Sequence, residues 1–259
     1  MKQLILPFAK TLITALMLTF VSSVSFGSTE GTLEPPKHYW KQDGIFGTYD
    51  RGALQRGFQV YKEVCSTCHS MNQMHYRNLT DLGYTEAQVK AIAAQYQVMD
   101  GPNDEGEMFE RPAIPADKFV APFKNEKQAR AANNGALPPD LSLIVRAREG
   151  GADYVHGILV GYAEPPEGVT VADGMHYNLY FPGHQIAMPQ MLMDNSVSYA
   201  DGTPATLEQE SSDVVAFLAW ASDPNMEARK QMGIKTIIFL AIFAIMMYFV
   251  KKKIWKDVG

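Results

Sequence analysis

The stretch Gln59-Val-Tyr-Lys-Glu-Val-Cys65-Ser-Thr-Cys68-His69-Ser-Met71 decides how this chain is organised. It contains the only two cysteines among 259 residues and places a histidine directly after the second. C-x-x-C-H is the attachment signature of c-type haem. Two thiols one turn apart can form thioethers to the two vinyl groups of one porphyrin, and the following imidazole can bind the iron. We therefore predict Cys65 and Cys68 as the covalent anchors of one haem c, and His69 as its proximal iron ligand.

Other chemistries also use two cysteines at this spacing: a redox dithiol, half of a zinc site or a disulfide. A zinc site of this type needs a second pair of ligands, and the sequence has no further cysteine. A thioredoxin-like dithiol would lie in a βαβ pattern. The apolar residues before Cys65 instead recur at helical spacing, at Leu54, Phe58, Tyr61 and Val64. Haem attachment is the favoured interpretation, and a haem-free exported dithiol module is the alternative.

Composition narrows the class of protein. The chain is 46 % hydrophobic with a formal net charge of −5, which fits one ordinary domain or two small ones. The mild acidity argues against nucleic-acid binding, because nucleic-acid binders carry basic faces. Acidic residues and prolines gather in residues 100–127, which we predict as a surface loop. Such a loop is either a solvated face or an electrostatic guide for a basic partner.

Residues 1–27 have the pattern of a secretory signal peptide. Lys2 and Lys10 flank the start, residues 11–21 are apolar, and small residues precede Gly27. An uncleaved N-terminal anchor is the alternative, but the charge-free stretch is short for a membrane span. Export agrees with haem attachment, which bacteria complete outside the cytoplasmic membrane.

Residues 232–250 are predicted to form a transmembrane helix. Only Lys235 interrupts this apolar stretch, and Lys251 to Lys253 follow it. Nineteen helical residues span roughly 28 Å, close to the roughly 30 Å hydrocarbon core of a bilayer. A buried core helix is the alternative. The lysines favour a cytoplasmic tail at 251–259, with an exported domain at 28–231.

The exported domain is predicted to be mainly helical, because its apolar residues recur at spacings of three and four. Tyr39 and Trp40 are expected to pack an N-terminal arm onto it, and Asp50 or Thr48 is expected to cap the helix that carries the signature. Asp140 is expected to open a short helix. The other predicted helices are 85–98, 126–134, 152–162 and 207–222, the last packing against the first.

A six-coordinate electron-transfer haem needs a second axial ligand, and a methionine thioether raises its reduction potential. We choose Met188, because it lies before a proline in a rigid loop well after the signature. With fourteen methionines in the chain, Met191, Met193 and His184 remain rivals. An arginine fork suits the haem propionates, but spacing alone does not choose between Arg130, Arg146 and Arg148.

The chain closely resembles the cytochrome c1 family, the haem subunits of the cytochrome bc1 complex (quinol:cytochrome c oxidoreductase). The block Asn133-Asn-Gly-Ala-Leu-Pro-Pro-Asp-Leu141 is distinctive of this family, whereas C-x-x-C-H alone indicates only a cytochrome c. The other segments that carry the resemblance are residues 56–71, 76–79, 145–151, 153–154, 178–183 and 188–189. The resemblance extends over nearly the whole mature chain, including its C-terminal anchor.

The resemblance implies a mainly α-helical, class I cytochrome c-like haem domain with loop insertions, plus one C-terminal transmembrane helix. It implies His69 and Met188 as axial ligands and Arg148 as the propionate partner. The haem pocket would be lined by Tyr154, Asn133, Leu137, Pro138 and Pro139. Some relatives carry an extra disulfide, which two haem-bound cysteines cannot form here.

The resemblance also implies a place in a complex. Electrons would arrive from a Rieske iron–sulfur subunit beside cytochrome b and leave to a cytochrome c, in a dimeric complex of the bacterial inner membrane with the haem domain on the periplasmic side. Enzyme activity would belong to the complex. The alternatives are a free-standing membrane-anchored monohaem cytochrome c serving another oxidase or reductase, and a haem enzyme or gas sensor with an open sixth position.

Overall fold

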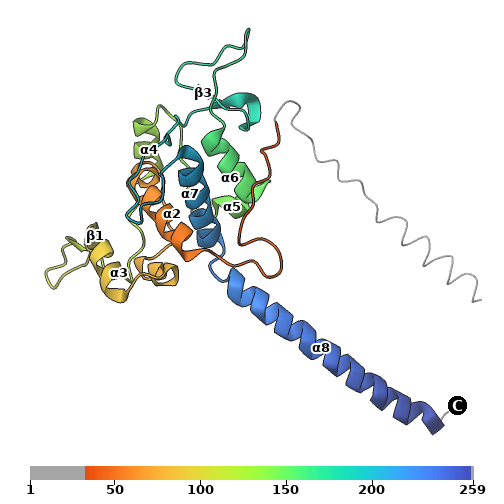
Figure 1. Cartoon of the computed structure of the whole chain (residues 1–259). Coiled ribbons are helices and arrows are strands. Elements are labelled where there is room, and N and C mark those ends of the chain that lie inside the picture. Colours follow the sequence, from red (N-terminus) through yellow and green to blue (C-terminus); the bar gives the residue numbers. More distant parts are fainter. Residues whose placement is uncertain (1–32, 258–259) are drawn as a thin grey trace, which may run out of the picture. The chain divides into compact units, whose positions relative to one another are not determined.

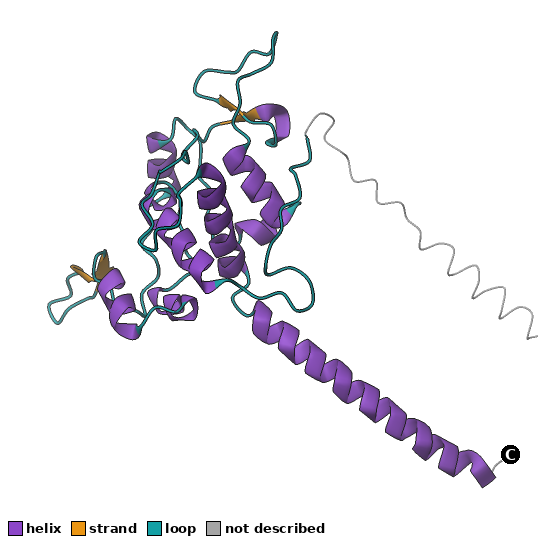
Figure 2. Cartoon of the chain, in the orientation of Figure 1, coloured by secondary structure: helices purple, strands orange, loops and turns teal. Residues whose placement is uncertain are grey.

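Two helices, α2 (Arg51–Glu63) and α7 (Leu207–Ser222), lie side by side at the centre of the fold (Figure 1). The computed structural model describes residues 33–257, so the predicted signal peptide lies outside the described residues. Helices dominate, and the strands form two short antiparallel pairs (Figure 2). The remaining elements, in chain order, are η1 (Cys65–Thr67), η2 (Tyr76–Leu82), α3 (Glu86–Ala93), β1 (Gln97–Asp100), β2 (Phe109–Pro112), α4 (Glu126–Ala132), α5 (Ile144–Ala147), α6 (Gly151–Val160), β3 (His176–Tyr177), η3 (Pro182–His184), β4 (Gln185–Ile186), α8 (Met226–Ile254) and η4 (Trp255–Asp257).

A glycine lets α2 and α7 approach closely. A Cβ atom added to Gly57 would lie 2.0 Å from the carbonyl oxygen of Asp213 and 2.8 Å from Cβ of Phe217. The Phe217 ring packs between two rings of α2, with centroids 5.7 Å from Phe58 and 5.8 Å from Tyr61. The predicted packing of the last helix of the domain against the first is therefore confirmed.

Helices α2 and α7 begin at residues whose side chains cap them. The Asp50 carboxylate accepts hydrogen bonds from the backbone N–H groups of Gly52 and Ala53, so Asp50 and not Thr48 caps α2. Helix α7 has the predicted bounds. The Thr206 hydroxyl caps its start by accepting from Gln209 N, and Asp223 ends it.

The predicted helix at 85–98 is too long. Helix α3 ends at Ala93, and residues 97–100 form strand β1 instead. Strand β1 pairs antiparallel with β2, with Gln97 opposite Pro112 and Asp100 opposite Phe109. The backbone groups of residues 97–100 find their partners across the hairpin, in residues 109–112 that local periodicity does not reveal. The segment predicted as a loop therefore contains a strand, although residues 101–110 are exposed as expected.

Two further details differ from the predictions. Tyr39 is 84 % exposed and does not pack the arm onto the domain, whereas Trp40 is 5 % exposed and does. The Trp40 indole N–H donates to the Asp153 carboxylate on α6 at 2.7 Å. The short helix α5 is preceded by Leu143, so Asp140 does not cap it.

Helix α8 is the one helix in residues 33–257 that is long and apolar enough to cross a membrane. It begins six residues before the predicted span of 232–250, and its first turns hold the N-terminal arm. The Glu227 carboxylate accepts from Tyr49 N at 2.6 Å and from Arg51 at 2.7 Å, and the Lys230 ammonium donates to the Gln42 carbonyl at 2.6 Å. The predicted fold class, a mainly helical domain with one C-terminal membrane helix, is confirmed.

Candidate haem-binding site

The C-x-x-C-H signature forms a tight turn at the end of α2. After Val64, the chain continues as η1, and the N–H groups of Cys68 and His69 both donate to the Cys65 carbonyl, at 3.1 and 2.9 Å. Both thiols are free and partly buried. Desolvation by burial raises the pKa of the Cys65 thiol to about 12. A redox dithiol needs a thiol with a lowered pKa, so this environment disfavours that alternative.

The His69 imidazole is oriented by a hydrogen bond to a distant loop. Its Nδ1 lies 2.8 Å from the Pro139 carbonyl oxygen. A carbonyl only accepts, so Nδ1 must carry the proton, which leaves Nε2 with its lone pair free. Burial lowers the pKa of His69, which favours the neutral ring that a metal requires. A fixed tautomer with a free Nε2 is what an axial ligand to iron needs, so the residues fit a haem.

The Asp140 carboxylate joins the signature to the Pro139 loop. It accepts three hydrogen bonds of 2.7–2.9 Å, from Ser70 Oγ, Asn72 N and Ser142 N. Burial raises the pKa of Asp140, but these hydrogen bonds together outweigh it and leave the pKa below its usual value. This role differs from the predicted one, the opening of a helix. The Asp-x-Ser pattern at 140–142, typical of a side chain that bonds the backbone two residues on, was the available signal.

The predicted pocket loop leaves α4 through residues with left-handed backbone. Asn134 has φ 49° and Gly135 has φ 87°, and the Asn133 amide donates to the Ala129 carbonyl at 2.7 Å. Beyond them, Leu137 and Pro138 are partly buried and Pro139 is exposed. The structure therefore brings the end of this loop to His69 through the Pro139 carbonyl.

The three candidate arginines have different surroundings. The Arg146 guanidinium pairs with Asp223 at 2.7 Å, and Arg130 donates to the Gly135 carbonyl at 3.0 Å. Arg148 is exposed at the end of α5, and within residues 33–257 no carboxylate pairs with it. Within the same residues the Arg148 guanidinium has neither a carboxylate nor a carbonyl partner, so it can serve an external carboxylate, which favours Arg148 over Arg146 and Arg130 as the partner of a propionate.

Tyr154 lies on α6 near Arg148. Burial raises the pKa of the Tyr154 phenol, and the Arg148 charge partly opposes that rise, so the two side chains interact electrostatically. Tyr154 packs partly buried against the same hydrophobic core as Cys65. This places one predicted lining residue on the core that supports the signature.

Met188 lies in a loop far along the chain from the signature, and Tyr162 anchors the backbone of that loop. The Tyr162 hydroxyl is within hydrogen-bond distance of two carbonyl oxygens, at 2.8 Å from Met188 and 3.2 Å from Pro189. The Met188 side chain is partly buried. Tyr162 was not among the residues singled out in the sequence. Its contact shows that the loop of the chosen ligand is tethered.

The rivals of Met188 differ in exposure and contacts. Met191 and Met193 are 40 % and 61 % exposed, so burial favours Met188 over both. The His184 ring stacks on Tyr177 with centroids 5.5 Å apart, and its Nδ1 lies 3.1 Å from the Asn178 carbonyl oxygen. The choice of Met188 over His184 rests on the family resemblance.

A C-x-x-C-H turn on a helical domain, with its histidine presenting Nε2, defines the class of cytochromes with a c-type signature. The sequence matches the Cytochrome C1 family over residues 40–258. This chain therefore belongs to the cytochrome c1 family, and the predicted resemblance is confirmed.

Known relatives agree in sequence over most of the chain. It is 52 % identical over 252 residues to the "Cytochrome b/c1" of Bradyrhizobium diazoefficiens, covering 89 % of this chain but only 37 % of that longer protein. It is 49 % identical over 239 residues to the mitochondrial "Cytochrome c1 1, heme protein" of Arabidopsis thaliana, covering 92 % and 78 % of the two chains. It is 47 % identical over 247 residues to the cytochrome c1 of Rhodospirillum rubrum, covering 89 % and 91 %.

Proposed function

We propose that this chain carries single electrons within a quinol:cytochrome c oxidoreductase, through one covalently bound haem c. Cys65 and Cys68 would form the two thioethers, and His69 and Met188 would be the axial ligands. The observation that carries the proposal is the hydrogen bond from His69 Nδ1 to the Pro139 carbonyl, which leaves Nε2 free for iron. When bound, the haem supplies an iron that alternates between the ferric and ferrous states.

The chain's own residues hold the ligands still. The Pro139 carbonyl fixes the His69 ring, and Asp140 fixes the segment after it. The Tyr162 hydroxyl holds the Met188 backbone. Arg148 would balance a propionate, and Asn133, Leu137, Pro138 and Tyr154 would line the pocket. Ligands held in this way move little when the iron changes charge by one, which favours fast electron transfer.

Membership of a larger complex is supported by the names of relatives. One is the "Cytochrome b/c1" of Bradyrhizobium diazoefficiens, and another is the "Cytochrome b-c1 complex catalytic subunit, mitochondrial" of Candida albicans, 46 % identical over 232 residues. By analogy, cytochrome b would lie beside this chain in a dimeric complex. A Rieske iron–sulfur subunit would deliver the electrons, and a cytochrome c would accept them.

The membrane arrangement follows from the charge pattern. Residues 1–27 would be removed as a signal, and residues 28–231 would form the periplasmic domain. Residues 232–250 would span the bacterial inner membrane inside the longer helix α8, and residues 251–259 would stay in the cytoplasm. Lys251, Lys252 and Lys253 in the last turns of α8 support this orientation.

The proposal is tested by capturing the tagged chain from gently solubilised membranes. A haem-stained denaturing gel and a dithionite-reduced minus oxidised spectrum are recorded on the same sample. A stained band together with haem b in the spectrum is the expected result. A stained band without haem b would indicate a free-standing carrier, and an unstained band would overturn the proposal. Carbon monoxide binding to the reduced protein at neutral pH would contradict the Met188 ligand.

A further inference from the structure

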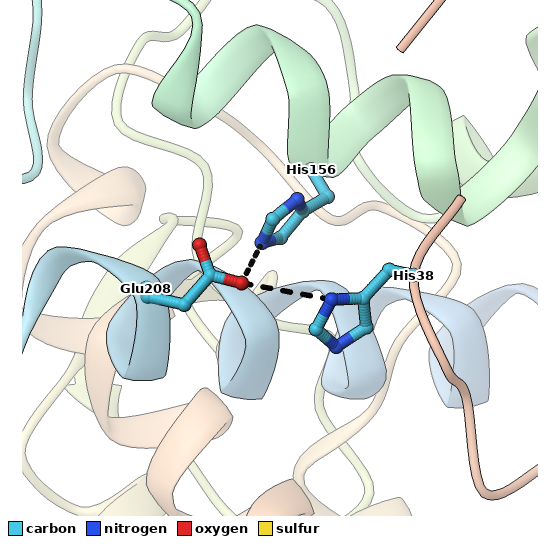
Figure 3. A group of neighbouring side chains, drawn as sticks. All are labelled: His38, His156 and Glu208. Carbon is cyan, nitrogen blue, oxygen red and sulfur yellow. Dashed lines mark ion pairs between the residues drawn. The ribbon is translucent and has the colours of Figure 1, made fainter. Parts of the chain in front are cut away.

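Two histidines and a glutamate meet on the side of the domain where the N-terminal arm crosses α6 and α7 (Figure 3). His38 comes from the arm, His156 from α6 and Glu208 from the first turn of α7. Glu208 Oε1 lies 3.3 Å from His156 Nε2 and 3.6 Å from His38 Nδ1. The three potential ligand atoms all lie within 4.8 Å of one another.

The arm is held in place independently of this cluster. Asp153 on α6 accepts two hydrogen bonds, from the His38 backbone N–H at 3.1 Å and from the Trp40 indole at 2.7 Å. The Trp40 ring also lies against the His38 ring, with centroids 4.4 Å apart. His38 is therefore positioned before any ion binds.

A hydroxyl group orients the His38 ring. His38 Nε2 lies 3.3 Å from the Ser212 hydroxyl, which leaves Nδ1 turned toward Glu208. Metal-bound histidines commonly make such a contact through their second nitrogen. His156 Nε2 lies 3.2 Å from the Ser211 hydroxyl, whose proton is donated to the Glu208 carbonyl. Because the neutral His156 ring then carries its proton on Nε2, an ion bound at Nε2 would require that proton to move to Nδ1.

An ion pair alone explains the cluster poorly. A histidine–glutamate ion pair needs a protonated ring, but burial lowers the pKa of His156, more strongly than the Glu208 charge raises it. The lowered pKa favours the neutral ring, and a neutral imidazole nitrogen is what a transition metal binds.

We propose that His38 Nδ1, His156 Nε2 and the Glu208 carboxylate form a binding site for a divalent transition-metal ion such as Zn²⁺. Two imidazoles and a carboxylate are a common zinc ligand set, with water completing the coordination. Ligands about 2.1 Å from a tetrahedral ion lie about 3.4 Å apart. The two distances to Glu208, 3.3 and 3.6 Å, match this value. The two imidazole nitrogens lie within 4.8 Å of each other and would adjust to the same spacing when the ion binds. The site is accessible to solvent, because the side chains of His38 and Glu208 are 27 % and 63 % exposed.

The ion would join the N-terminal arm to α6 and α7, which already pack against each other in the hydrophobic core. His38 belongs to the segment before α2, whereas α6 and α7 belong to the second half of the domain. The site does not involve the residues assigned to the haem, so it stands or falls separately from the proposed function.

The test uses the full-length chain, captured by its tag from solubilised membranes, stripped with EDTA and dialysed against Zn²⁺. The zinc retained per copy of this chain is then measured by plasma mass spectrometry, and its affinity by calorimetry. The wild type is expected to bind one more zinc per copy than Glu208→Gln or His38→Gln, or to bind it at least about 100-fold more tightly. Losing a residue that only supports a ligand typically lowers metal affinity by roughly 10–100-fold, so a larger loss indicates a ligand itself. Both substitutions change side chains that are at least partly exposed, so the domain should still fold.

His176→Gln serves as the control, because His176 is exposed on β3 and remote in sequence from the three ligands. It should bind zinc as the wild type does. X-ray absorption at the zinc edge should show two imidazoles and oxygen ligands in the wild type. Equal zinc in the wild type and Glu208→Gln, or an edge spectrum without imidazole, would overturn the proposal.

Discussion

Substituting Gly57 by alanine tests the close approach of α2 and α7, on which the position of the signature depends. Ordinary contacts begin near 3.4 Å, but the new Cβ would lie 2.0 Å from the Asp213 carbonyl oxygen and 2.8 Å from Phe217 Cβ. No side-chain rotation relieves either overlap, so the helices must separate. Overpacking typically costs 1–3 kcal/mol, and we expect about 3 kcal/mol here. The higher helix propensity of alanine offsets about 1 kcal/mol of this, so the free energy of unfolding should fall by about 2 kcal/mol.

Gly52→Ala on the same helix is the matched control. There a Cβ would meet only the ends of two side chains, Asp50 Oδ1 at 3.3 Å and Arg56 Nη1 at 3.6 Å. It should therefore keep the propensity gain of about 1 kcal/mol without the clash. Guanidinium unfolding of both full-length, haem-loaded variants, followed by circular dichroism, should separate them by about 3 kcal/mol. Equal midpoints for the two variants would refute the reasoning, because the overlap would then cost nothing.

Three further predictions concern the proposed site. Met188→Ala should keep its covalent haem, but its reduction potential should fall by a sizeable part of the roughly 0.8 V range that axial ligands control. An unchanged potential in a redox titration would exclude Met188 as the ligand. Arg148→Gln should lower the reduction potential, because a nearby cation favours the reduced iron. Arg146→Gln should not, because the Arg146 guanidinium pairs with Asp223. Equal shifts in the two variants would contradict the assignment of Arg148. The Asp140 carboxyl has a lowered pKa, so its stabilisation is present above pH 3.8 and is lost as pH falls through the folded-state pKa. Unfolding measured against pH should show a smaller acid loss in Asp140→Asn than in the wild type, and identical acid limbs would argue against this role.

Helices with strong local signals were predictable from the sequence. Helix α7 has its predicted bounds, because Thr206 supplies a capping hydroxyl and Pro224 follows its end. The hairpin of β1 and β2 was not predictable in the same way. Tyr96 continues the apolar spacing of α3 beyond its end, and the strand exists only because residues 109–112 supply partners from farther along the chain. Local periodicity carries no information about such a pairing.

The candidate site shows the same division. The signature names Cys65, Cys68 and His69 from spacing alone, since their chemistry depends on neighbours in sequence. The His69 contact with Pro139 joins residues 70 positions apart, and only the fold reveals it. The choice among three arginines likewise needed their partners in space, which the spacing of Arg130, Arg146 and Arg148 left open.

The two proposed axial ligands are held by hydrogen bonds to loops and not by regular secondary structure. On one side, the Pro139 carbonyl fixes the tautomer and direction of the His69 ring. On the other, the Tyr162 hydroxyl, 26 positions before Met188, holds the backbone of the ligand loop. The packed helices α2 and α7 contribute many of the buried apolar side chains, whereas neither of these hydrogen bonds lies at their crossing. Substitutions at the helix crossing should therefore change stability, whereas a substitution at Tyr162 should mainly change how firmly the proposed ligand Met188 is held at the iron.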